Sequence, residues 1–248
     1  YDALITEWFS GGKNAGVMLN FGRKLRYGEN PHQWGKFYEV CASSCKGTAC
    51  RAPTGSAFHM HQGKELSYCN ILDADAAWNA VWEFGEPTAV FVKHANPSGV
   101  ASNDTIEDAF QRAYDADRLS AFGVVIALNR PCTEGVVRKI IDQKMFVEVI
   151  VAPEYEGRAL ALLGEKPKVR ALEVLRSTYQ VLRNATYRSA FGGMLVQDED
   201  TKVVAEEDLT LVTEKRPTAE QVRDLLFAWK VVKHAKSNAI VFARDRVT

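Results

Sequence analysis

The sequence lacks an excess of charge, a long hydrophobic run and a leader-like start. Its 248 residues contain 31 Lys and Arg against 31 Asp and Glu, so the formal net charge is zero at pH 7. A neutral chain has no overall field to attract nucleic acid or an anionic membrane. No apolar run approaches the roughly 18 residues of a membrane-spanning helix, and no basic-then-apolar signal pattern opens the chain. We therefore expect a cytoplasmic protein that binds neither nucleic acid nor membranes.

The short motifs of several common enzyme classes are also missing. The chain has no G-x-x-x-x-G-K-[ST] loop, no G-x-G-x-x-G segment after a strand and no G-x-S-x-G turn. None of its five His residues is followed two positions later by Glu, as zinc deaminases require. These absences exclude those classes, and a phosphate on any ligand must be held by a local cluster.

Cysteine is scarce, with five residues in the chain. An odd count without a signal peptide favours a reducing compartment. Three of them lie in EVCASSCKGTAC, at spacings C-x3-C-x4-C, and FHMH follows. Thiolates and imidazoles are the usual zinc ligands, but no C-x2-C pair is present. We interpret residues 41–63 as a solvated, variable insert and expect no bound metal; a metal-binding module built from these Cys and His residues is the alternative.

Short apolar runs alternate with amphipathic stretches along the rest of the chain. Strands are predicted at residues 88–93, 123–128, 147–152, 168–175 and 238–244, with a further strand starting in GGMLVQDED. Helices are predicted at residues 69–84, 106–117, 134–145, 156–165 and 218–237. Asp73 and Asp75 lie early enough in the first helix to favour its amino end. The alternation predicts an α/β fold with a mostly parallel sheet.

The segment VKHANPSGVA places two chemically capable side chains at the end of a predicted strand. Lys93 and His94 come last in the strand, and residues 96–99 (Asn-Pro-Ser-Gly) predict a turn. Ligands of open α/β sheets bind beyond the carboxyl ends of strands. Histidine can move a proton near neutral pH, and an adjacent Lys can stabilise developing negative charge. The pair is a candidate site, although most isolated Lys–His pairs are surface or structural residues.

Three further segments carry residues suited to a nucleotide-like ligand. Arg26 can form a bidentate pair of hydrogen bonds with a phosphate, and Tyr27 can stack on the ligand or hydrogen-bond to it. Gly123 lets the backbone approach a ligand closely, and Asn238 opens the last predicted strand. The plainer alternatives are a loop with a solvated Arg and, for Asn238, an Asx turn or cap.

Together these segments resemble the aminoimidazole carboxamide ribonucleotide (AICAR) transformylase part of the bifunctional purine biosynthesis enzymes. The matching blocks are LRYGENPHQ, QGKELSYCNILDADAAW, VKHANPSGVA, SAFGVVIALNR, FVEVIVAP, GGMLVQDED and RDLLFAWKVVKHAKSNAIVFARDR. They follow the family's order over residues 20–248, which is far more specific than any single short motif. YDALI is similar to the family's junction between its cyclohydrolase and transformylase parts.

The resemblance implies transfer of a formyl group from 10-formyltetrahydrofolate to the amine of AICAR, a step of inosinate (IMP) synthesis that needs no metal. It implies that His94 accepts the proton from the amine and that Lys93 stabilises the oxyanion of the transition state. The substrate-binding residues that it implies are Arg26 and Tyr27 on the phosphate side, Gly123, Glu148 and Asn238.

The resemblance also implies the architecture. It predicts a cytidine deaminase-like α/β subdomain without the deaminase zinc, in an intertwined homodimer. Residues 1–20 would end a linker, residues 21–215 form the first transformylase subdomain, and residues 216–248 lead into a second subdomain that holds most of the folate pocket. Cyclohydrolase activity is not expected from this chain. The alternative to a formyltransferase is a catalytically silent fragment that binds the nucleotide without a complete folate site.

Overall fold

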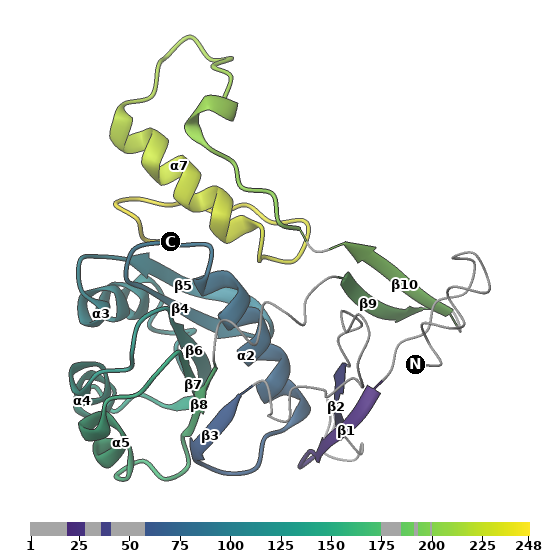
Figure 1. The fold of residues 1–248 in the computed structure, drawn as a ribbon. Helices are drawn as coiled ribbons and strands as arrows, with labels where there is room; N and C mark the ends of the chain where they lie inside the picture. The colour runs from purple at the N-terminus through teal and green to yellow at the C-terminus, as the bar shows by residue number, and fades with distance from the viewer. Residues whose placement is uncertain (1–18, 28–35, 41–57, 175–184, 191–192, 199) are drawn as a thin grey trace, which may run out of the picture.

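A six-stranded mixed sheet forms the centre of the computed structural model, which describes residues 19–27, 36–40, 58–174, 185–190, 193–198 and 200–248 (Figure 1). In order across the sheet, the strands are β3 (His59–Gln62), β8 (Arg170–Glu173), β7 (Val147–Ala152), β6 (Val124–Leu128), β4 (Thr88–Lys93) and β5 (Asn96–Ser102). The pairs β6–β7 and β7–β8 are parallel, and the other three pairs are antiparallel. The α/β class is confirmed, with parallel pairing confined to the three central strands β6, β7 and β8.

Helices cover both faces of the sheet, which explains why the central strands read as continuous apolar runs. Helix α2 (Tyr68–Val81) packs on one face, and helices α3 (Ile106–Ala116), α4 (Glu134–Asp142) and α5 (Gly157–Leu163) pack on the other (Figure 1). Alternate residues of β4 serve the two layers: Val90 and Val92 pack with α2, and Phe91 packs with Phe110 of α3. The core is therefore two apolar layers divided by the sheet.

The remaining elements lie around this core. Two small antiparallel pairs join β1 (Leu19–Lys24) to β2 (Lys36–Val40) and β9 (Ala185–Ala190) to β10 (Gly193–Asp198). A short 3-10 helix, η1 (Glu206–Asp208), precedes helix α7 (Ala219–Val232). Helix α7 attaches to the core by Phe227, whose ring centroid lies 4.9 Å from that of Phe84.

Side-chain caps fix where the helices begin. Ser67 and Asn70 form a capping box at the start of α2, and Thr105, Thr133 and Thr218 cap α3, α4 and α7. Each cap accepts a hydrogen bond from an otherwise unpaired N–H in the first turn. The first turn of α2 contains no acidic residue. The expectation that Asp73 and Asp75 support its amino end was wrong, because the helix starts at Tyr68.

Two sequence-based expectations need correction around strand β4. The strand at 88–93 is present and buried, but it runs antiparallel to both neighbours, β5 and β6. Residues 96–99 begin strand β5 instead of making a turn, and Pro97 is tolerated because β5 is an edge strand. The turn falls on His94 and Ala95. The carboxyl end of β4 therefore lies beside the amino ends of β6 and β7.

Toward both ends of the chain, the observed elements also differ from the predicted ones. Residues 238–244 form no strand: only an isolated bridge joins Arg244 to Val247, and Phe242 is 87% exposed. Helix α7 ends at Val232, before the predicted residue 237. Strand β3 falls in the segment interpreted as an insert, so the end of that segment belongs to the central sheet.

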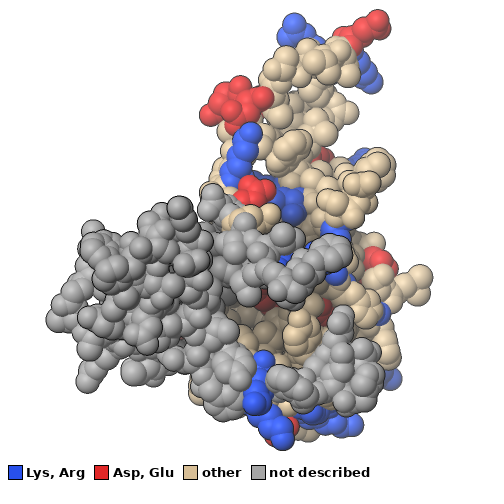
Figure 2. Space-filling view, turned by 90° about the vertical axis from the view of Figure 1, so that its right-hand side faces the viewer, with Lys and Arg blue, Asp and Glu red and all other residues tan. Residues whose placement is uncertain are grey.

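Charged side chains of both signs are interspersed on the described surface, as the upper part of Figure 2 shows. This distribution agrees with the zero net charge of the chain. Within the described ranges, no helix combines the length and the apolar character that crossing a membrane requires.

Gly99 on β5 is where α3 comes closest to the sheet. A Cβ atom at this position would lie 2.2 Å from the backbone carbonyl oxygen of Ala113. Because a backbone atom cannot move aside without displacing α3, we expect Gly99→Ala to lower the free energy of unfolding by about 1–3 kcal/mol or more. Gly85→Ala is the matched control, since nothing lies within 4 Å of its added Cβ. Urea unfolding of both variants checks this, and equal stabilities would contradict the packing described here.

Candidate functional site

One edge of the central sheet carries several of the residues predicted to form a site. Val92 pairs with Val125, and Val124 pairs with Val147. These pairings bring Lys93 at the end of β4, Gly123 before β6 and Glu148 early in β7 to the same edge. The candidate site therefore lies at the amino ends of the parallel strands. Lys93 ends strand β4, as expected, but β4 runs antiparallel to β6, so this end lies beside the amino ends of the parallel strands.

His94 lies in a tight two-residue turn between β4 and β5. His94 and Ala95 have φ angles of 53° and 55°, as a type I′ hairpin turn requires. The left-handed region costs a residue other than glycine about 1–2 kcal/mol. The His94 side chain is exposed, and the Lys93 Nζ donates to the carbonyl oxygen of Phe122 at 3.0 Å. The turn thus presents the imidazole to solvent while the ammonium reaches the loop that carries Gly123.

Arg26 and Tyr27 lie together at the amino end of α2. The Arg26 guanidinium lies 4.5 Å from the centroid of the Tyr27 ring, and its Nη2 donates to the Tyr27 hydroxyl at 2.6 Å. Backbone hydrogen bonds attach the pair to the helix start: Arg26 N donates to Leu66 O at 3.1 Å, and Tyr68 N donates to Tyr27 O at 3.2 Å. An exposed Arg beside a helix amino terminus is an arrangement that favours an anion.

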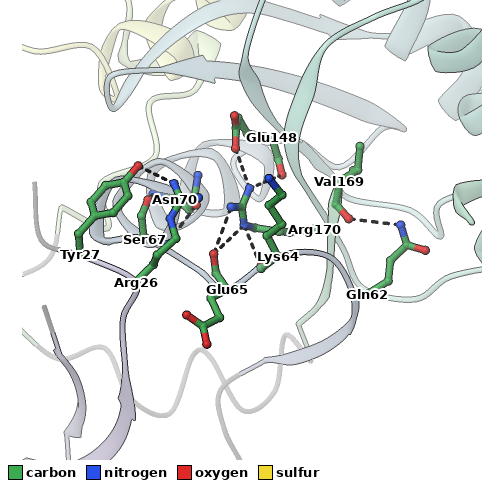
Figure 3. Close-up of polar contacts among 10 residues, drawn as sticks. All are labelled: Arg26, Tyr27, Gln62, Lys64, Glu65, Ser67, Asn70, Glu148, Val169 and Arg170. Carbon is green, nitrogen blue, oxygen red and sulfur yellow. Dashed lines mark hydrogen bonds and ion pairs between the residues drawn. The ribbon is translucent and has the colours of Figure 1, made fainter. Parts of the chain in front are cut away.

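Glu148 is held by Arg170, a residue that sequence reasoning missed (Figure 3). Arg170 is 2% exposed, and its Nη1 lies 2.6 Å from a carboxylate oxygen of Glu148. The same guanidinium donates to the backbone carbonyls of Lys64 and Glu65, at 3.0–3.2 Å. Arg170 therefore fixes both Glu148 and the segment that leads to the Ser67 cap. A charged residue inside KVRALEVL was the only signal for it.

Gly123 and Asn238 both follow the Lys93–His94 pair in the sequence, and contacts bring their segments back to it. Gly123 has a φ angle of 71°, and its N–H donates to Phe146 O at 2.8 Å. Asn238 is exposed and follows Lys236, whose Nζ donates to the carbonyl oxygen of His94 at 3.3 Å. The structure thus gathers Lys93, His94 and the segments around Gly123 and Asn238.

Arg26 and Tyr27 connect to the His94 turn through α2. Tyr68 contacts Tyr27, and Asp73 accepts a hydrogen bond from Ala95. At about 1.5 Å of rise per residue, the two contact points lie roughly 7–8 Å apart along the helix. Helix α2 thus links the Arg26–Tyr27 pair to the turn that carries His94.

A cavity of about 300 Å³ lies elsewhere in the described part, against α2. Its lining is mostly apolar and includes Phe37, Phe58, Trp78 and Leu172. None of the predicted site residues lines it.

Only the two His residues of the alternative metal-binding segment lie within the described part of the chain. The three Cys residues at 41, 45 and 50 lie outside the described residues. His61 Nε2 lies 2.8 Å from a carboxylate oxygen of Glu173, and the His59 ring packs on that of His61. Among the residues that are described, no three His, Cys, Asp or Glu side chains are placed to hold a metal ion.

Cys132 is buried in the core, and burial raises the pKa of its thiol far above the ordinary value.

Comparison with known proteins defines the class. The family model described as "AICARFT/IMPCHase bienzyme" matches residues 1–248. The chain belongs to this family.

The particular relatives are proteins named bifunctional purine biosynthesis protein PurH. The chain is 42% identical to the one from Caldicellulosiruptor saccharolyticus and 45% identical to the one from Anoxybacillus flavithermus. Each alignment covers 100% of this chain and 48% of the relative. The chain therefore spans about half the length of these relatives, whose names place them in purine biosynthesis.

Proposed function

We propose that this chain provides the AICAR-binding half of a formyltransferase that uses 10-formyltetrahydrofolate in the biosynthesis of IMP. The observation that carries the proposal is the exposed His94 on a fixed turn, next to Lys93, in a member of the AICARFT/IMPCHase family. Formyl transfer requires a base for the amine and a cation for the oxyanion. Lys93 at the end of β4 and His94 in the turn supply these two side chains.

The chemistry assigned to these residues is one proton transfer and one charge stabilisation. The amine nitrogen of AICAR attacks the formyl carbon and loses a proton to the neutral imidazole of His94. The negative charge that develops on the formyl oxygen is stabilised by the Lys93 ammonium. The C–N bond to N10 of tetrahydrofolate then breaks, and that nitrogen leaves with a proton. Arg26 and Tyr27 hold the phosphate of AICAR, with Gly123, Glu148 and Asn238 as further contacts.

Other parts of the proposal follow from the family resemblance. They are a cytidine deaminase-like subdomain, an intertwined homodimer, a cytoplasmic location and a reaction without metal. A silent nucleotide-binding fragment is the second candidate, because the chain spans 48% of a relative that it matches.

A turnover assay separates the two candidates. Formyl transfer depends on holding amine and donor in near-attack geometry, and we place most of the folate pocket in the part of the relatives that the alignment with this chain does not cover. We expect efficient transfer from a protein of the relatives' full length and little from the 248-residue chain alone. Formation of formylated AICAR with both proteins checks this. Equal turnover would place the folate site within the present chain, and no turnover by either would favour the silent fragment.

A further inference from the structure

The turn that carries His94 is held from outside by residues far away in the sequence. Ala95 N donates to the Asp73 Oδ1 at 2.7 Å, from the middle of α2. The His94 carbonyl accepts from the Asn96 amide at 3.0 Å and from the Lys236 ammonium at 3.3 Å. Lys236 N in turn donates to the Asn96 side chain at 3.0 Å. Two distant segments, α2 and residue 236 after α7, therefore fix a two-residue turn.

The turn needs this support because its conformation is costly. His94 and Ala95 both lie in the left-handed region, where each residue costs about 1–2 kcal/mol. Such strain persists only where surrounding contacts over-determine the backbone. Of the contacts to the turn described above, that of Asp73 is the shortest, and it is made to the backbone of Ala95 itself.

Asp73 is unlike its neighbour on the same helix. Asp75 is exposed and accepts a hydrogen bond from Asn79, one turn further along α2. Asp73 is partly buried and reaches out of the helix to another element. Burial raises the pKa of the Asp73 carboxyl, while the hydrogen bond from Ala95 and the charges of His94 and Lys236 act in the opposite direction. The carboxyl is thus placed where desolvation opposes its charge and the turn offsets part of that cost.

We infer that Asp73 is a positioning residue, which fixes the His94–Ala95 turn through Ala95 N and so aims the imidazole at the amine of the substrate. This inference rests on the proposed function for the reaction that His94 serves, and its structural part stands without it. The capped, rigid start of α2 makes the helix a suitable support, because Ser67 and Asn70 hold its first turn.

The test uses Asp73→Ala and Asp73→Asn in a protein of the relatives' full length, with Asp75→Ala as the matched control. Asparagine keeps an oxygen that can accept from Ala95 N, whereas alanine removes it. A misplaced catalytic group costs up to about 100-fold in rate. We therefore expect Asp73→Ala to lower kcat about 10–100-fold with little change in the KM for AICAR. Asp73→Asn should recover most of the loss, and Asp75→Ala should match the unmodified protein.

Amide hydrogen exchange at Ala95 gives a second readout that does not depend on activity. We expect exchange to accelerate in Asp73→Ala and to stay slow in Asp73→Asn and Asp75→Ala, with thermal melting confirming that each variant is folded. Unchanged exchange in a folded Asp73→Ala would overturn the inference, as would an Asn variant no better than Ala in kcat. If the unmodified protein shows no turnover, the proposed function fails, and the exchange data still decide whether Asp73 holds the turn.

Discussion

His94→Ala is expected to lower the turnover of formyl transfer by roughly 10²–10⁴-fold, the usual contribution of general acid–base catalysis. The imidazole is exposed at the turn between β4 and β5, where it can meet a substrate amine. A neutral imidazole has one ring nitrogen that can accept the proton which the amine loses. Steady-state kinetics with saturating AICAR and 10-formyltetrahydrofolate, in a protein of the relatives' full length, checks this.

Binding of AICAR should survive this substitution far better than turnover. The phosphate contacts assigned to Arg26 and Tyr27 lie at the start of α2 and do not involve the imidazole. Calorimetric titration of the His94→Ala variant with AICAR provides the control. Near-normal turnover by this variant would remove His94 from the mechanism.

Of the substitutions considered for stability, Arg170→Met is expected to lower the free energy of unfolding most. The guanidinium is almost fully buried and pairs with Glu148 at 2.6 Å. The substitution removes the donor from the Glu148 carboxylate and from the carbonyls of Lys64 and Glu65. Breaking a buried ion pair in this way costs about 3–5 kcal/mol. Denaturant unfolding measures the loss.

Arg158→Met is the matched control for this prediction. Its guanidinium is 88% exposed and lies 3.8 Å from a carboxylate oxygen of Glu134. Exposed pairs of this kind contribute about 0–1 kcal/mol. Similar losses in the two variants would show that Arg170 does not organise the segment before α2.

The sequence predicted the strands and helices better than their directions. Strand β7 coincides with the predicted residues 147–152, because a β-branched run buried on both faces has a strong pattern. The same pattern carries no information on the direction of the neighbours, so β4 was expected to be parallel. Residues 238–244 also read as such a run, but their apolar side chains at 240 and 242 are exposed.

The sequence named the candidate site residues one by one, but it did not reveal the residues that hold them in place. Local turn chemistry favoured Asn-Pro-Ser-Gly, but the pairing of β5 with β4 and the contacts of Asp73 and Lys236 place the turn on His94 and Ala95. Both contacts join residues that are distant in the chain, so no local pattern reveals them. Arg170 was missed for the same reason: its partners at residues 64, 65 and 148 come together only in the folded sheet.

Titration of AICAR into a protein of the relatives' full length, and into its Arg26→Ala variant, measures whether Arg26 binds the nucleotide. We expect one AICAR site per chain with a measurable heat of binding. We also expect at least tenfold weaker affinity in the variant, because Arg26 supplies a charge-assisted hydrogen bond to the phosphate. Absence of binding, or equal affinity in the two proteins, would contradict the assignment of this chain as the AICAR-binding half of a formyltransferase.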